Sequence, residues 1–347
     1  MRILGIDPGT VSFDLCLLEG EDIIFEDSIP STAVAERPQE FAEKCLGLNL
    51  DVMIAPSGMG INNRKLPELT EREMFELTLV REGEEVPVLE GMKKFLAIVS
   101  QAGLEVFFLP SVIQMPTVPA WRKINKVDMG TADKLCIAAL SVETVSRQKG
   151  VAYSEVSHVV VELGGGYNAV LTIDGGRIIN GIGGTLFPGP GFMNAGAMDG
   201  EIAYLLRGFE KSLLFGGGAG DLTGSKNLLR ENFTAELYPH AFNAFVEGVL
   251  FAVCSQQALI SGKEVYLSGR LTGYENIYIP VKTRLEELGY EVSQLPVLSE
   301  KSKAAAQGYA LVGNGSYGGY YKPLVKHMMI DKAEGSVIDH VYWKERI

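Results

Sequence analysis

The sequence predicts an α/β protein made of two duplicated lobes, each built on a mixed sheet with helices. Its 347 residues are too many for one small core and suit two domains. A unit of strand, glycine turn, strand, turn and strand begins at residue 1 and recurs near residue 158. Strands alternating with helices follow this unit in both halves, which indicates an internal duplication at the level of topology.

Apolar runs and helical spacing place the elements of the first half. Strands are expected at 2–7, 13–18, 23–25, 51–55 and 105–109. Helices are expected at 37–46, 70–80, 88–101 and 129–147. The last of these helices stands where the first half ends, so we interpret it as a crossover between the lobes.

The second half repeats the pattern. Strands are expected at 158–163, 169–173, 177–181, 264–267 and 291–295, and helices at 234–261, 276–288 and 303–312. The small-residue helix 303–312 is the second crossover. We therefore expect an N-terminal lobe of residues 1–135 completed by 303–347, and a C-terminal lobe of residues 136–302.

Composition excludes several classes of protein. The chain is 46% hydrophobic and 21% charged, an ordinary globular balance. The sequence has no apolar stretch of about 18 residues, the length that a membrane span needs, and no signal peptide. We therefore expect a cytoplasmic protein that does not bind membranes. A net charge of −12 argues against nucleic-acid binding. The four cysteines and four histidines are scattered, which argues against an iron–sulfur or zinc site.

The first glycine cluster follows the opening strand and reads Asp7-Pro8-Gly9-Thr10-Val11-Ser12. Glycine lets the backbone approach an anion closely, and the hydroxyls of Thr10 and Ser12 add donors. Asp7 ends the strand, where a carboxylate can hold Mg²⁺ through water. Taken alone, the cluster is also compatible with a plain hairpin turn.

Two further clusters follow strands in the second half. Gly164, Gly165 and Gly166 separate two apolar strands, and their entropic cost favours a close backbone approach over a plain turn. Later, Ser268-Gly269 ends a strand and Gly273 closes the loop. This third loop suits a flat base or ribose, and a simple strand–helix turn is the alternative.

In order and spacing, the three clusters resemble the phosphate-1, phosphate-2 and adenosine motifs of the acetate and sugar kinase, heat-shock chaperone and actin superfamily. The resemblance covers residues 1 to about 315. It implies two ribonuclease-H-like lobes with mixed five-stranded sheets around a cleft that binds ATP and Mg²⁺. The nucleotide-binding residues that it implies are Gly9, Thr10, Ser12, Gly164, Gly165, Gly166, Asn168, Ser268, Gly269 and Gly273.

The implied metal-binding carboxylates are Asp7 and Glu162. Glu162 stands where the superfamily usually has Asp, one methylene shorter, so direct metal contact by Glu162 stays open. The run 181–191, with its Gly-Gly and Phe-Pro, is similar to the segment that faces the acyl substrate in acetate and butyrate kinases. The whole chain is most similar to an archaeal family of uncharacterised proteins labelled predicted butyrate kinase.

Two features depart from the carboxylate kinases, which carry an Arg in the Phe-Pro segment and start the first loop with Asn. An acyl phosphate is made through positioning and charge neutralisation, so an Arg is expected near the acceptor. Arg64, Arg122 and Arg270 are the candidates, and Arg122 is favoured because it lies on the connector before Asp128.

The acidic candidates for catalysis beside Asp7 are Asp128 and Asp133. For a hydroxyl acceptor, one of them is the general base; for a carboxylate acceptor, the same group orients Mg²⁺ or water. Capping of the helix 129–147 by Asp128 is the alternative.

We predict an ATP-dependent phosphotransferase for a small molecule such as a short-chain carboxylate. The alternatives are a sugar or alcohol kinase, an ATPase switch, and a nucleotide-binding regulatory protein. A homodimer and the role of the tail 317–347 are left open.

Overall fold

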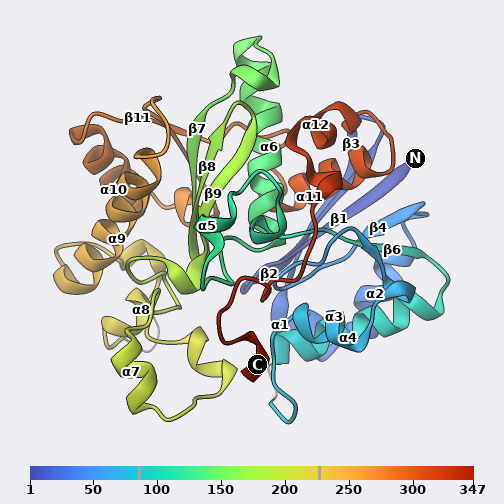
Figure 1. The fold of residues 1–347 in the computed structure, drawn as a ribbon, viewed down its shortest axis with the longest axis horizontal. Coiled ribbons are helices and arrows are strands. Elements are labelled where there is room, and N and C mark those ends of the chain that lie inside the picture. The colour runs from blue at the N-terminus through green and yellow to red at the C-terminus, as the bar shows by residue number, and fades with distance from the viewer. Residues whose placement is uncertain (85–86, 226–227) are drawn as a thin grey trace.

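The computed structural model describes residues 1–84, 87–225 and 228–347, which form two α/β lobes (Figure 1). The first lobe is built on a six-stranded sheet of order β3-β2-β1-β4-β6-β5. The second is built on a five-stranded sheet of order β11-β10-β7-β8-β9. The strands are β1 (Arg2–Pro8), β2 (Ser12–Glu19), β3 (Asp22–Pro30), β4 (Val52–Ile54), β5 (Arg64–Lys65), β6 (Glu105–Phe108), β7 (His158–Leu163), β8 (Asn168–Asp174), β9 (Arg177–Ile182), β10 (Glu264–Ser268) and β11 (Glu291–Gln294).

The two sheets have the same plan. In the first, β1 pairs antiparallel with β2 and parallel with β4. In the second, β7 pairs antiparallel with β8 and parallel with β10. The predicted duplicated fold with mixed sheets is therefore confirmed. The sixth strand of the first sheet is β5, a two-residue strand that pairs with Phe107 and Phe108 and is too short to leave a sequence pattern.

Helices cover both sheets. They are α1 (Ser31–Glu36), α2 (Pro38–Leu46), α3 (Glu71–Glu76), α4 (Pro87–Gln101), α5 (Ala120–Lys123), α6 (Ala132–Lys149), α7 (Gly200–Leu205), α8 (Ala219–Leu222), α9 (Pro239–Gln257), α10 (Glu275–Glu287), α11 (Ala304–Ser316) and α12 (Lys322–Met328). α9 begins at Pro239 and not at residue 234 as predicted, because proline lacks the N–H group that a helix interior requires. α3 is shorter than expected, and the chain leaves it through Leu79, whose φ is 51°.

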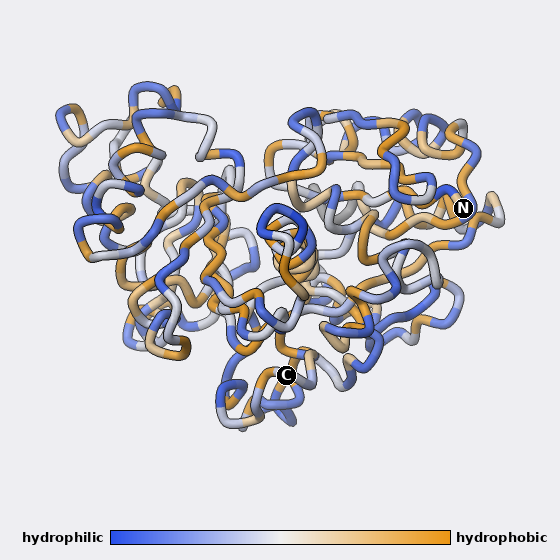
Figure 2. Tube along the Cα trace, turned by 90° about the horizontal axis from the view of Figure 1, so that it is seen from above, coloured by the Kyte–Doolittle hydropathy of each residue, from blue (hydrophilic) through white to orange (hydrophobic). Residues whose placement is uncertain are grey.

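The helices α6 and α11 pack against each other between the sheets, and their core joins Ile3 of β1 to Val160 of β7. A Cβ atom at Gly308 of α11 would lie 2.2 Å from the carbonyl oxygen of Cys136 in α6, so glycine is required for this approach. Seen from above, the two lobes lie on either side of a central helix (Figure 2). The first turns of these two helices point at the ends of the hairpins β1–β2 and β7–β8, which places charged residues there.

The tail packs on its own chain. Leu324 and Met328 of α12 are buried in the core that surrounds α6 and α11. Farther along the tail, the carbonyl oxygen of Gly335 accepts a hydrogen bond from the Gln114 side chain at 3.0 Å. The carbonyl oxygen of His340 accepts one from the backbone N–H of Asn125 at 2.9 Å. Within the part of the chain described, no helix is long and apolar enough to cross a membrane.

Candidate functional site

A cavity of about 500 Å³ lies between the two lobes. Its walls come from the turns of the two hairpins, the first turns of α6 and α11, and the 3₁₀ helix η5 (Lys211–Phe215). The lining residues that the sequence singles out are Asp7, Gly9, Thr10, Asp128, Asp133, Glu162, Gly164, Gly165, Gly166 and Arg270.

The turns of the two hairpins face each other across this cavity. A Cβ atom at Gly166 would lie 3.1 Å from the hydroxyl oxygen of Thr10, and one at Gly165 would lie 3.1 Å from Val11 Cγ2. The absence of a side chain at both glycines leaves backbone on one wall, opposite the hydroxyl group of Thr10 on the other. Backbone and hydroxyl groups that face each other in this way are suited to an anion with several oxygens.

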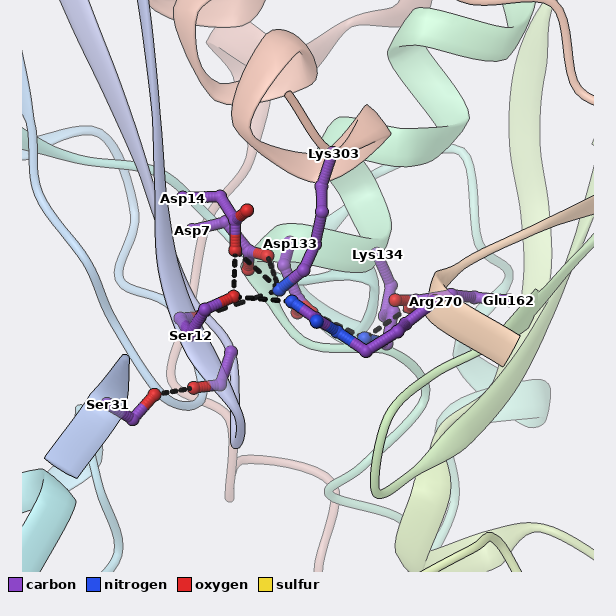
Figure 3. Close-up of polar contacts among 10 residues, drawn as sticks. Asp7, Ser12, Asp14, Ser31, Asp133, Lys134, Glu162, Arg270 and Lys303 are labelled. Carbon is purple, nitrogen blue, oxygen red and sulfur yellow. Dashed lines mark hydrogen bonds and ion pairs between the residues drawn. The ribbon is translucent and has the colours of Figure 1, made fainter. Parts of the chain in front are cut away.

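Lys303, the residue before α11, extends from the start of this helix toward Asp7 and Asp14 of the first hairpin (Figure 3). Its Nζ lies 2.6 Å from Asp14 Oδ2 and 3.5 Å from Asp7 Oδ2. Ser12 donates a hydrogen bond to Asp14 at 2.5 Å and accepts one at 2.6 Å from Arg270, which belongs to the second lobe. The carboxylates of Asp7 and Asp14 on the first hairpin are therefore joined in one network with the cations Lys303 and Arg270 from elsewhere in the chain.

The second hairpin has a similar but smaller network. Lys134, in the first turn of α6, forms ion pairs with Asp133 beside it and with Glu162 at the end of β7 (Figure 3). The hydroxyl of Thr131 donates a further hydrogen bond to Asp133. The side chains of Lys134 and Glu162 are only 11% and 13% exposed, so this ion pair is shielded from water.

The burial of these groups shifts their pKa values in different directions. Desolvation raises the pKa of Asp7 to about 7, although Lys303 acts to lower it. Desolvation also raises the pKa of Glu162, against the effect of Lys134. Burial acts to raise the pKa of Asp133 as well, but the charge of Lys134 and the hydrogen bonds to it and Thr131 outweigh burial and lower the pKa. Asp133 is consequently a poor proton acceptor.

The donor set fits a magnesium ion that arrives with phosphates. Across residues 1–84, 87–225 and 228–347, no three His, Cys, Asp or Glu side chains are grouped to hold a metal ion. Mg²⁺ is usually bound by one or two carboxylates together with substrate phosphates and water. Asp7 suits this role because it is buried, lines the cavity and lies no closer than 3.5 Å to Lys303. Glu162 suits it less well because Lys134 occupies its carboxylate.

Some predicted residues have other surroundings. Arg122 donates to the carbonyl oxygen of Ile179 at 2.7 Å, and Arg64 pairs with Glu73, and neither lines the cavity. Ser268, Gly269, Gly273 and Asn168 do not line it either. A Cβ at Gly269, whose φ is 96°, would lie 2.5 Å from the carbonyl oxygen of Leu163, so the close approach there is to the chain itself.

Asp128 and Asp133 both line the cavity, but their helix positions differ from those predicted. α6 begins at Ala132 after Thr131, so Asp128 does not cap it and that alternative is wrong. Asp133 is in the first turn. Asp128 Oδ2 instead accepts hydrogen bonds from the backbone and hydroxyl of Thr185, both at 2.9 Å, which ties it to the glycine-rich run 181–191.

Several site residues were not predicted. The cations Lys134 and Lys303 stand at corresponding places, each in or just before the first turn of a crossover helix, and this symmetry is a signal that the sequence contains. Tyr167 and Lys211 also line the cavity, and no pattern in the sequence marks them, whereas Thr185 lies in the run 181–191 that the sequence singles out.

A family model described as a protein of unknown function, DUF1464, matches residues 5–343. The chain belongs to the DUF1464 family. No curated protein matches this DUF1464 chain in sequence.

Solved structures show that this DUF1464 member has the fold of acetate and propionate kinases. A propionate kinase from Francisella tularensis aligns with a TM-score of 0.63 at 13% identity, covering 89% of this chain and 98% of that one. Acetate kinase from Porphyromonas gingivalis aligns with a TM-score of 0.57 at 13% identity, covering 88% and 97%. Acetate kinase from Entamoeba histolytica gives 0.56 at 10% identity, covering 83% and 87%. At these identities the likeness establishes the fold.

Proposed function

We propose that this protein is an ATP-dependent phosphotransferase whose acceptor is a small molecule. The observation that carries the proposal is the apposition of the two hairpin turns, with Gly165 and Gly166 opposite Val11 and Thr10 on one cavity. The chain shares its fold with ATP-dependent kinases, and this supports the proposal. The cofactor set is ATP with Mg²⁺.

The proposed division of labour follows from the charges. Backbone groups of the second hairpin and the Thr10 hydroxyl hold phosphate oxygens, and Asp7 holds Mg²⁺. A bound Mg²⁺ would neutralise charge on the phosphoryl group that is transferred. Lys134 and Lys303 offer two further positive charges beneath the turns, where phosphate oxygens can compete with the carboxylates for them. Catalysis of this kind works by positioning and charge stabilisation.

A short-chain carboxylate is the acceptor that the cavity supports best, in keeping with the resemblance to the family labelled predicted butyrate kinase. A hydroxyl acceptor needs a general base. Asp133 is engaged by Lys134 and Thr131, and Asp128 by Thr185. A carboxylate needs no base. A sugar or alcohol kinase is therefore the weaker alternative.

The test is ADP formation by the purified full-length protein with Mg²⁺–ATP and a panel of acids and alcohols. We expect turnover that depends on a short-chain acid and yields an acyl phosphate, detected as the hydroxamate. Hydrolysis at the same rate without any acceptor would instead favour the ATPase switch. Binding of ATP without turnover across the panel would favour a regulatory protein.

A further inference from the structure

One wall of the cavity is formed by η5. Tyr167 donates a hydrogen bond from its hydroxyl to the carbonyl oxygen of Leu214 at 2.7 Å, and its ring packs edge-on against Phe215 at 5.7 Å. These contacts fix the wall to the end of the second hairpin. Lys211, Leu214 and Phe215 all line the cavity, so the wall combines one cation with apolar surface.

Lys211 differs from the other cations of the cavity. Lys134 and Lys303 form ion pairs, and Arg270 is bonded to Ser12. Among the described residues, Lys211 Nζ has neither a hydrogen bond nor a carboxylate within 4.0 Å, although the residue is half-buried. Burial lowers the pKa of Lys211, against the more distant charges of Asp128 and Glu84. A partly desolvated cation without a partner is costly, and an anionic ligand would offset that cost.

We propose that Lys211 binds the carboxylate of the acceptor and that Leu214 and Phe215, with Met59 from the first lobe, contact its alkyl chain. This inference rests on the proposed function and identifies the acceptor end of the same cavity. It also replaces the predicted arginine: Arg64 and Arg122 lie outside the cavity, and Arg270 is held by Ser12. The small apolar surface suits an acid of a few carbons.

The acceptor wall is also connected to the first lobe. The backbone N–H of Lys211 donates to Glu84 Oε2 at 2.9 Å, and Arg81 donates to the carbonyl oxygen of Phe209 at 2.5 Å. Both contacts cross from one lobe to the other. The wall that carries Lys211 is therefore held both by its own lobe, through Tyr167, and by the first lobe.

Phosphoryl transfer from ATP to a carboxylate requires no proton donor or acceptor. A carboxylate oxygen attacks the γ-phosphorus of ATP, one O–P bond forms, and the bond between that phosphorus and the β,γ-bridging oxygen breaks. The electron pair leaves with ADP, and the products are the acyl phosphate and ADP. With one carboxylate oxygen held by Lys211, the other is free to attack.

The test compares the wild-type protein with Lys211→Met, Lys211→Arg and, as a control, Lys332→Met, which changes an exposed lysine outside the cavity. Binding of ¹³C-labelled butyrate, propionate and acetate is measured by NMR titration, and ATP binding by calorimetry. We expect Lys211→Met to weaken acid binding at least tenfold and raise the KM for the acid, with ATP affinity and Tm unchanged. Lys211→Arg should restore much of the loss, and Lys332→Met should behave as wild type.

Equal acid binding by wild type and Lys211→Met would overturn the inference, as would failure of the wild type to bind any of the three acids. A loss of ATP affinity in Lys211→Met with acid binding intact would assign Lys211 to the nucleotide and also overturn it. Failure of the proposed function gives a different result, because the wild type would then form no acyl phosphate from ATP and any of the acids, even where acid binding depends on Lys211.

Discussion

The hairpins β1–β2 and β7–β8 occupy equivalent places in the two lobes but present different chemistry to the cavity. Each first strand carries a carboxylate near its end, Asp7 or Glu162, and each carboxylate lies near a lysine from a crossover helix. In the first hairpin the turn adds side-chain groups, with Ser12 and Asp14 in the network. In the second, the turn consists of three glycines and Tyr167 and adds no charged side chain.

This difference indicates how a duplicated structure divides one task. The glycines of the second hairpin leave space for an anion beside the backbone, whereas the first hairpin concentrates charge. The two carboxylates also differ in how tightly a lysine holds them. Lys303 lies 3.5 Å from Asp7, whereas Lys134 is in close contact with Glu162. We infer that the first hairpin supplies the metal-binding group and that the second grips phosphate.

The largest effect is expected from the strand-end carboxylates. Asp7→Asn should lower turnover about 10²- to 10³-fold because it removes the charge that holds the metal against the phosphates. Glu162→Gln should cost about tenfold, because Lys134 already occupies this carboxylate. Rates of ADP formation measure both, with the exposed Asp22→Asn as control. Equal losses from the two variants would contradict the assignment of the metal to the first hairpin.

The two lysines should differ in their effect on stability. Lys134→Met leaves Asp133 and Glu162 buried without a counter-charge, so it should lower the free energy of unfolding by about 3 kcal/mol. Lys303→Met should cost about 1 kcal/mol, because the Lys303 side chain is more exposed, at 23%, and Asp14 keeps its bond to Ser12. Urea denaturation at pH 7.5 measures both. The reverse order would show that the second network is not the more tightly shielded one.

The first residues of β1 and β7, the equivalent strands of the two lobes, should differ in how they affect stability as the pH changes, and this effect is smaller. Arg2 opens β1 near the surface, whereas His158 opens β7 in full burial and contacts Ser141 at 2.9 Å. Burial lowers the pKa of His158 to about 3 from its ordinary value near 6.5. Between these values only the unfolded chain binds the proton, so stability is lost as the pH falls.

Relative to His158→Gln, the wild type should lose about 1.4 kcal/mol of unfolding free energy between pH 7.5 and pH 5.5. Urea denaturation of both proteins at the two pH values gives this difference, and the subtraction removes the contribution of the carboxylates. The same loss in both proteins would mean that His158 titrates normally in the folded state.

Much of the fold could be predicted because its determinants are local. The strand–glycine–strand units are visible as apolar alternation broken by turn residues, and they recur at residue 158. Boundaries were less predictable: Pro239 shortens α9, and β5 depends on pairing with β6, which sequence alone does not reveal.

The candidate site was most predictable where its residues lie on the hairpins, although Asp128, Asp133 and Arg270 also line the cavity. Asp7, Thr10 and Gly166 come together as the duplication implies, and their roles stay predictions. The position of Lys303 at the start of a crossover helix could have been noticed, but its contact with Asp7 could not, because the two residues are 296 positions apart. Arg122 was favoured from its place on the connector, but α5 directs it to the carbonyl oxygen of Ile179.

The central claim is that ATP phosphates lie between the two hairpin turns, and calorimetric titration of Mg²⁺–ATP into wild type and Gly166→Val tests it most directly. The wild type should bind one ATP per chain. In the variant, the new side chain points toward Thr10 and should weaken binding at least tenfold, while crowding against Thr10 and Met193 lowers Tm by a few degrees and leaves the protein folded at the temperature of the titration. Gly200→Val, at a position with open space, should bind as wild type does. Equal affinity in Gly166→Val and wild type, or no binding by the wild type, would contradict the claim.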